Sequence, residues 1–175
     1  MWTLEPDLIA RSVPRYTSYP TAAAFADGVD GGAQKAALEA LTPATPLSLY
    51  LHIPYCDRIC WYCGCNTSTS GRDGRVVRYA EALAAEIALV GGMARGQVHS
   101  IHFGGGSPNA LPPADFAALM QALRQSFAVA GDAEIAVELD PRTLSDAFIA
   151  ALAAAGVQRV SLGVQTFAAH VQKAI

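Results

Sequence analysis

The stretch Leu49-Tyr-Leu-His-Ile-Pro-Tyr-Cys56 continues directly into Asp57-Arg-Ile-Cys-Trp-Tyr-Cys-Gly-Cys65, and the chain is organised around it. All four cysteines of the protein lie here with the spacing C-x3-C-x2-C-x-C: Cys56, Cys60, Cys63 and Cys65. Thiolates are soft ligands that suit iron–sulfur clusters, zinc or copper(I). In a cytosolic protein such crowding indicates a metal site or catalysis rather than disulfides. The first question is therefore which metal binds and for what purpose.

The composition describes a folded protein without a nucleic-acid signature. The 175 residues are enough for one domain with a real core. Twelve basic and 15 acidic residues give a net charge of −3, which provides no basic surface for nucleic acid. Residues 1–7 do not resemble a signal peptide, and no apolar run reaches the ~20 residues that span a membrane. We expect a cytoplasmic protein.

From Leu47 onward, segments with strand character alternate with segments of helical period. Strands are expected at residues 47–53, 98–103, 134–139 and 159–164. Helices are expected at 76–90, 113–127 and 145–155, with a last one starting before the chain stops. This alternation predicts an α/β fold in which right-handed β/α crossovers build a parallel sheet.

Residues 1–46 read differently and are expected to form an N-terminal arm, with the β/α part at 47–175. Prolines and glycines recur through the arm, and one short helix is plausible at 33–41. Its segment Arg15-Tyr-Thr-Ser-Tyr-Pro-Thr21 carries two tyrosines near an arginine. These aromatic side chains either pack the arm onto the domain or stack on an aromatic substrate.

The distinctive loops all follow strand ends. The cysteines follow the first strand, Gly104–Gly106 follow the second, Glu138 ends the third and Gln165 follows the fourth. Active sites of parallel β/α folds form where the carboxyl ends of the strands gather, so we expect one working edge. Each feature also has a simpler explanation: the glycines as a tight turn, Glu138 as a helix-capping acid and Gln165 as a surface residue.

The cysteine spacing favours an iron–sulfur cluster over zinc. Three thiolates at C-x3-C-x2-C can each bind one corner of a 4Fe–4S cube and leave the fourth iron open to a small molecule. Structural zinc usually joins two cysteine pairs from separate segments, and this chain has no second pair. A zinc-binding structural module stays open as the alternative.

The cysteine loop, with Tyr62 before its third cysteine, resembles the radical S-adenosylmethionine (SAM) superfamily. A closer resemblance, to the oxygen-independent coproporphyrinogen III oxidase (coproporphyrinogen dehydrogenase) family, rests on motifs that occur in the family's order. They are Arg15–Thr21, Leu51-His-Ile-Pro-Tyr-Cys56, Cys63-Gly-Cys65, Phe103-Gly-Gly-Gly-Ser-Pro108, Glu138-Leu-Asp-Pro141 and Ser161-Leu-Gly-Val-Gln-Thr-Phe167. Cys65 and the arm separate this family from the related haem chaperone, which typically has phenylalanine at that position.

The resemblance implies a TIM-like β/α barrel and a set of residue roles. The cluster ligands would be Cys56, Cys60 and Cys63. Contacts to the cluster-bound SAM would be Tyr50, Gly105 and Glu138. Contacts to a second SAM would be Tyr62, Gly106, Ser107 and Gln165. Ser107 stands where the family commonly has threonine and keeps the hydroxyl. Cys65 would matter for activity, in a role that the sequence does not define.

The implied reaction begins with reductive cleavage of SAM to methionine and a 5′-deoxyadenosyl radical. The radical takes hydrogen from a propionate of coproporphyrinogen III, and loss of carbon dioxide and an electron leaves a vinyl group. Two such decarboxylations give protoporphyrinogen IX. The family further implies a monomer served by a reductant such as flavodoxin or ferredoxin.

The chain is short for this fold, because a complete barrel needs ~250 residues. We therefore expect an N-terminal fragment with about four β/α units that is not fully active. The alternative is a non-catalytic iron–sulfur or haem-trafficking protein on the same scaffold.

Overall fold

The computed structural model describes residues 21, 24–71 and 73–174, so most of the Arg15–Thr21 motif lies outside the described residues. Two compact units divide the chain, residues 1–34 and 35–175. Helix α2, Gly31–Glu39, spans the division and lies two residues earlier than the short helix expected at 33–41. It begins after Asp30, whose Oδ1 accepts a hydrogen bond from the Ala33 amide at 3.0 Å.

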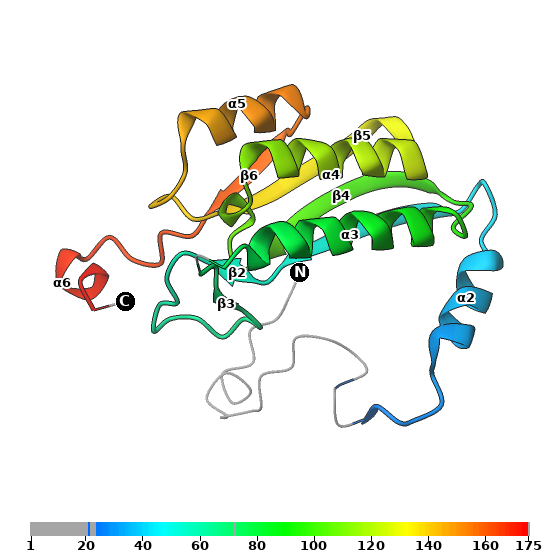
Figure 1. Ribbon diagram of the computed structural model, residues 1–175, viewed down its shortest axis with the longest axis horizontal. Helices are drawn as coiled ribbons and strands as arrows, with labels where there is room; N and C mark the ends of the chain where they lie inside the picture. Colours follow the sequence, from blue (N-terminus) through cyan, green and yellow to red (C-terminus); the bar gives the residue numbers. More distant parts are fainter. Residues whose placement is uncertain (1–20, 22–23, 72, 175) are drawn as a thin grey trace, which may run out of the picture. The chain divides into compact units, whose positions relative to one another are not determined.

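The second unit contains a four-stranded parallel sheet in the order β1-β4-β5-β6 (Figure 1). The strands are β1 Pro46–Ile53, β4 Gln97–Gly105, β5 Ala128–Leu139 and β6 Arg159–Leu162. Each predicted strand is present, and neighbouring strands run in the same direction. The α/β class with a parallel sheet is confirmed.

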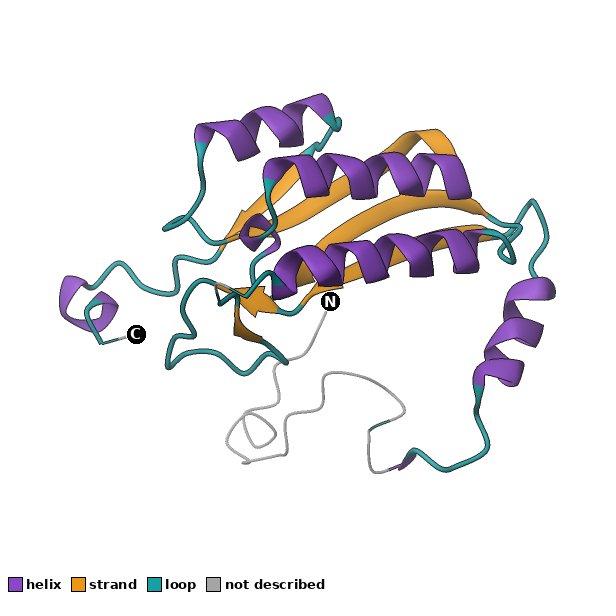
Figure 2. Ribbon diagram, in the orientation of Figure 1, coloured by secondary structure: helices purple, strands orange, loops and turns teal. Residues whose placement is uncertain are grey.

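Three helices connect these strands and cover one face of the sheet (Figure 2). They are α3 Arg75–Gly91, α4 Pro113–Ser126 and α5 Asp146–Ala154, and the short α6, Ala169–Gln172, follows β6. Ser145 caps α5 by accepting a hydrogen bond from the Phe148 amide at 3.2 Å. Gly156 follows this helix with a positive φ of 73°, a common way to end a helix.

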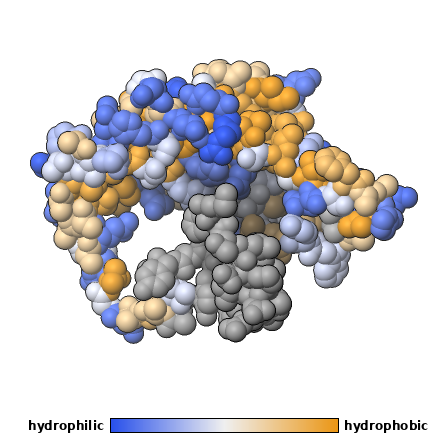
Figure 3. Space-filling model, turned by 180° about the vertical axis from the view of Figure 1, so that it is seen from behind, coloured by the Kyte–Doolittle hydropathy of each residue, from blue (hydrophilic) through white to orange (hydrophobic). Residues whose placement is uncertain are grey.

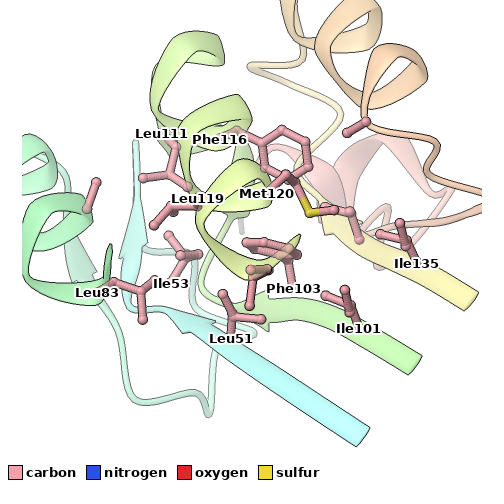
Figure 4. Close-up of a cluster of buried hydrophobic side chains, with 14 of the residues drawn as sticks. Leu51, Ile53, Leu83, Ile101, Phe103, Leu111, Phe116, Leu119, Met120 and Ile135 are labelled. Atoms are coloured by element: carbon pink, nitrogen blue, oxygen red, sulfur yellow. The ribbon is translucent and has the colours of Figure 1, made fainter. Parts of the chain in front are cut away.

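The hydrophobic core lies between the sheet and these helices (Figure 4). Ile53, Ile101 and Phe103 point into it from the strands and are fully buried. Phe116 of α4 packs on Phe103 with ring centroids 5.1 Å apart, and Phe148 of α5 packs on Phe116 at 5.3 Å. Because side chains alternate along a strand, burying this set turns the intervening residues to the opposite face.

That opposite face of the sheet is polar. Ser48 and Ser100 hydrogen-bond across β1 and β4 with Oγ atoms 2.6 Å apart, and Arg159 pairs with Glu134 at 2.6 Å. Figure 3 views the molecule from this side, where hydrophilic residues (blue) are visible beside a hydrophobic area (orange) in the upper part. The described residues contain no helix long and apolar enough to cross a membrane.

Beyond the shift of α2, three differences from the sequence prediction concern the strands. Strand β5 begins at Ala128 rather than 134, because Gly131-Asp132, residue types depleted in strands, continue through it instead of turning. Strand β6 ends at Leu162 instead of 164. Two short strands that pair in parallel, β2 Tyr55–Cys56 and β3 Ser68–Thr69, flank the cysteine loop and are too short to show a period in sequence.

Candidate functional site

The predicted working edge is present, since all four strands of the main sheet are parallel and their carboxyl ends share one side. The cysteine loop follows β1, and Gly104–Ser107 end β4 and lead into the short 3-10 helix η2, Pro108–Ala110. Glu138 lies at the end of β5, and Gln165 follows β6. The sheet topology alone therefore assembles residues that are far apart in sequence.

The cysteine loop is anchored at its base and exposed at its tip. The Ser68 amide donates to Pro54 O at 2.9 Å, and the Ser70 amide donates to Cys56 O at 2.8 Å. These bonds hold β3 against β2, and Cys56 at the base is buried. At the tip, Trp61 and Tyr62 are 91% and 68% exposed. The large aromatic side chains are thus available to a ligand or to another part of the fold.

Two hydroxyl groups lie within hydrogen-bonding distance of the Cys56 sulfur. Ser107 Oγ donates to Cys56 Sγ at 3.5 Å from the buried end of β4, and Thr67 Oγ1 lies at the same distance. Hydrogen bonds to a ligand sulfur stabilise its negative charge and tune the metal group that it holds. Ser107 is only 5% exposed, so its hydroxyl faces this sulfur rather than open solvent.

The donor set of the loop fits an iron–sulfur cluster. All four cysteines are free thiols; Cys60 and Cys63 are partly exposed and Cys65 is exposed. Among the described residues, no group of three or more His, Cys, Asp or Glu side chains could hold a single metal ion. Thiolates are the ligands that iron–sulfur clusters use, and three of them on one loop match a cube whose irons occupy separate corners. Cys56, Cys60 and Cys63 would hold it.

A second group of side chains gathers on the polar face beside the loop. The rings of Tyr50 and His102 stack with centroids 5.7 Å apart, and His102 Nε2 lies 3.2 Å from Glu138 Oε1. Gly104 lies between them: a Cβ there would be 3.0 Å from both Glu138 Oε2 and the Tyr50 ring. Partial burial, followed by the charge of Glu138, raises the pKa of Tyr50. Two predicted SAM contacts, Tyr50 and Glu138, are thus brought together.

Gly105 and Gly106 join the end of β4 closely to the cysteine loop. Gly105 has a positive φ of 114°, and a Cβ there would lie 2.8 Å from the His52 ring. A Cβ on Gly106 would lie 2.5 Å from Thr67 Oγ1 and 2.6 Å from Tyr55 O. The glycines are therefore required by packing, which gives the tight-turn explanation a physical basis. Their contacts to SAM stay a prediction.

Gln165 has an unusual backbone conformation after β6. Its φ of 65° is the only positive value of a non-glycine residue in the described part of the chain. Such conformations cost energy and cluster at functional sites. The outlier adds support to the predicted contact between Gln165 and the second SAM, whereas exposed Tyr62 gains no such support.

Cys65 interacts both with the cysteines of the loop and with the group formed by Tyr50 and Glu138. Partial burial raises the pKa of the Cys65 thiol, and Cys63 and Glu138 raise it further, which favours the protonated form. Cys65 in turn contributes to the raised pKa of Tyr50. Cys63 and Glu138 thus both act on the pKa of Cys65, which in turn acts on that of Tyr50, and the role of Cys65 stays unassigned.

The sequence interpretation missed the residues behind the site, Asn109, Asp140 and Arg142, and gave His102 no role. Asn109 Nδ2 donates to Asp140 O at 2.9 Å, and its Oδ1 accepts from the Asp140 amide at 2.9 Å. Arg142 forms a two-pronged ion pair with the Asp140 carboxylate. His102 was detectable, since it precedes Gly104 by two strand positions and therefore shares its face. The Asn109–Asp140 pairing joins two separate loops and left no sequence signal.

Comparison with known proteins agrees with this geometry. The family model of the radical SAM superfamily matches residues 50–175, which includes the cysteine loop and every strand end. The chain belongs to the radical SAM superfamily.

Within the superfamily, the chain is similar to proteins that are described as oxygen-independent coproporphyrinogen III oxidases. Oxygen-independent coproporphyrinogen III oxidase from Bradyrhizobium diazoefficiens is 49% identical over 165 residues, which cover 93% of this chain and 37% of the relative. The Escherichia coli protein of that description is 42% identical over 94% of this chain and 36% of the relative. The solved structure of Escherichia coli coproporphyrinogen III oxidase, described as a radical SAM enzyme, matches 98% of this chain and 38% of its own at a TM-score of 0.83. The chain spans little more than a third of these relatives.

Proposed function

We propose that this chain forms the cluster-binding part of an oxygen-independent coproporphyrinogen III oxidase. The observation that carries the proposal is the convergence at one sheet edge of a three-thiol loop with Tyr50 and Glu138. The relatives at 40–49% identity with the same description support the same reaction class. When bound, the 4Fe–4S cluster would supply one electron for each reductive cleavage of SAM, and each cleavage would start the decarboxylation of one of the two propionates of coproporphyrinogen III.

Under this proposal each part of the site has a task. Cys56, Cys60 and Cys63 hold the cluster, with Cys56 placed by β2 and hydrogen-bonded by Ser107. Tyr50, Gly105 and Glu138 would bind the first SAM, and the Glu138 carboxylate can accept hydrogen bonds from ribose hydroxyls or pair with an ammonium group. A second SAM would contact a set drawn from the loop, β4 and the segment after β6: Tyr62, Gly106, Ser107 and Gln165.

The proposed setting is a monomer in the cytoplasm, supplied with electrons by flavodoxin or ferredoxin. The four free cysteines suit a reducing compartment. We propose that the 175-residue chain binds a cluster without completing substrate conversion, since a full barrel needs ~250 residues. Residues 1–46 would form the arm of this enzyme and 47–175 the first part of its barrel.

The test is anaerobic reconstitution of the chain, followed by iron, sulfide and zinc analysis. We expect about four irons and four sulfides per chain, reduced to background in the triple variant Cys56→Ala, Cys60→Ala, Cys63→Ala. SAM and dithionite are then added and 5′-deoxyadenosine is measured. Cluster binding with no cleavage, also in a form extended to the length of the relatives, would indicate a non-catalytic binding protein. Zinc in place of iron would contradict the proposal outright.

A further inference from the structure

An ion pair with no assigned role begins the segment after β5, at the same end of the sheet as the cysteine loop. Asp140 Oδ1 accepts from the Arg142 amide at 2.9 Å and from Arg142 Nε at 3.0 Å, and Asp140 Oδ2 accepts from Arg142 Nη2 at 2.7 Å. The Asp140 side chain is 8% exposed and that of Arg142 is 51% exposed. The carboxylate is therefore the fixed, buried end of the pair, and the guanidinium is its outer end.

Asn109 fixes this pair relative to the cluster loop. Its side chain satisfies both main-chain groups of Asp140 and also donates to Thr143 Oγ1 at 3.0 Å. Two residues earlier, Ser107 donates to Cys56 Sγ. The buried segment 107–109 thus holds the Asp140–Arg142 pair at one end and a proposed cluster ligand at the other.

A chain of contacts links the guanidinium to the cysteine loop: Arg142 donates to Asp140, Asn109 binds the main chain of Asp140, and Ser107 in the same buried segment donates to Cys56. The hydrogen bonds that Arg142 donates to Asp140 make the largest contribution to the raised pKa of Arg142, and Cys60 and Cys56 add to it. The pKa of Asp140 is set by burial, which raises it, and by Arg142, which lowers it further than burial raises it. Cys56 and Cys60 thus act on the pKa of Arg142 and not on that of Asp140.

We propose that Arg142, held by Asp140 and Asn109, stabilises the reduced state of the cluster bound by Cys56, Cys60 and Cys63 and so raises its reduction potential. Reduction adds one electron from the external donor to the cluster and breaks no bond. The added negative charge interacts favourably with a nearby fixed positive charge, and net charge around a cluster is one determinant of its potential. This inference rests on the proposed function, since it requires that the loop bind a cluster.

The chain contains a matched control for the experiment. Asp73 and Arg75 form the same Asp-x-Arg pair, with Arg75 Nε and Nη2 donating to the carboxylate at 2.9 and 2.8 Å. This pair is exposed at the start of α3, with Asp73 50% exposed. Replacing Arg75 removes the same local bonds and the same charge from a place outside the proposed cluster site.

The measurement is a redox titration of the anaerobically reconstituted chain, followed by electron paramagnetic resonance in the absence of SAM. In Arg142→Gln, the ratio of reduced to oxidised cluster at a fixed potential should fall about three- to tenfold, equivalent to ~30–60 mV for a one-electron couple. Arg142→Lys keeps the positive charge but not the two-pronged pairing with Asp140, so its ratio should stay above that of Arg142→Gln. Arg75→Gln should leave the ratio unchanged.

The possible outcomes separate this inference from the proposed function. Equal ratios in Arg142→Gln and the unmodified chain, or an equal fall in Arg75→Gln, overturn the inference alone. A chain that takes up no iron and sulfide overturns both. If Arg142→Gln alone fails to load, the double variant Asp140→Asn, Arg142→Gln decides, because it removes the guanidinium without leaving an unpaired buried carboxylate. Its ratio should fall below that of the unmodified chain, and an equal or higher ratio overturns the inference.

Discussion

Two connections of this protein contain the same local motif in opposite surroundings. The segment after β1, residues 54–74, carries the cysteine loop and ends on the Asp73–Arg75 pair, while the segment after β5, residues 140–145, begins with the Asp140–Arg142 pair. Both arginines donate from Nε and Nη2 to their aspartate. Asp73 is 50% exposed and Asp140 only 8%. The same residue pattern thus gives the same hydrogen bonds, and only the surroundings make one pair a surface feature and the other a fixed charge.

The largest loss of stability is expected from a substitution where the segment after β1, residues 54–74, packs against the end of β4. In Gly106→Ala the new methyl would meet Thr67 Oγ1 at 2.5 Å and the main-chain oxygen of Tyr55 at 2.6 Å. Because a main-chain atom cannot rotate away, we expect the free energy of unfolding to fall by about 2–3 kcal/mol. Gly64→Ala is the control in the same loop, since a Cβ there meets nothing within 4 Å. Urea unfolding measures both, and equal losses would contradict this account of Gly106.

For the second connection, residues 140–145, the replacement of Asn109 is expected to reduce the free energy of unfolding most. Asn109→Ala leaves the buried amide and carbonyl of Asp140 without the partners that they have at 2.9 Å. Unsatisfied buried polar groups are costly, and we expect a loss of about 2 kcal/mol in unfolding free energy. Asn66→Ala serves as the comparison, because Asn66 is exposed and its hydrogen bond from His52 uses the main-chain oxygen. Thermal and urea unfolding should show little change for Asn66→Ala; a comparable loss there would refute the buried-anchor explanation.

Replacing Asp140 should reduce the free energy of unfolding by an amount that depends on pH, whereas replacing Asp73 should not. Burial raises the pKa of Asp140, and hydrogen bonds from Arg142 lower it by more, so the net direction is downward. A lowered folded-state pKa stabilises the fold above the unfolded value of about 3.9 and loses this contribution as pH falls through the folded value. Asp140→Asn should therefore cost about 1 kcal/mol at pH 7 and less at pH 3.

Asp73→Asn is the matched variant for that measurement. Hydrogen bonds from Arg75 lower the pKa of Asp73, but the pair is exposed and solvent screens it. We expect its unfolding midpoint to equal that of the unmodified chain at both pH values. A pH-dependent loss as large as that of Asp140→Asn would remove the distinction between the two pairs.

The smallest effect is expected at the helix that follows the first connection. Tyr79 Oη donates to His52 O at 2.6 Å, and its ring packs on Tyr55 at 5.5 Å. Tyr79→Phe keeps the ring contact and removes the hydrogen bond, for an expected loss of about 0.5–1 kcal/mol. Tyr62→Phe, at an exposed ring, should change nothing measurable in urea unfolding. No loss in Tyr79→Phe would mean that α3 is anchored by its apolar face alone.

Much of the fold followed from periodic patterns. The helical period of residues 76–90 predicted α3, and the structure buries Val76, Ala80, Leu83 and Ile87 along one side of that helix. Ser145 and Gly156 marked the ends of α5 because caps act on neighbouring residues. The predicted start of β5 was wrong because Gly131-Asp132 is typical of a turn, whereas β5 pairs with β4 on both sides of it, at Ala128–Val129 and from Glu134 onward, with a register shift between the two.

The site was predictable to the extent that it follows strand ends. Parallel strands had to bring the cysteine loop, the glycines and Glu138 to one edge, and they do so. The paired β2 and β3, the Ser107–Cys56 contact and the Asn109 anchor were not predictable. Each joins residues from different loops, and no periodicity or spacing encodes such a contact.

By itself, the sequence determined the four free thiols on one loop, the order of strands and helices, and the local Asp-x-Arg geometry, because these depend on residue type and on neighbours along the chain. The tertiary structure alone decided which aspartate is buried, that Asn109 and Ser107 link the Asp140–Arg142 pair to Cys56, and that Gly104 lets Tyr50 and Glu138 approach each other. Burial and the distance between charges are properties of the packed molecule, and they decide whether identical local motifs act on the site.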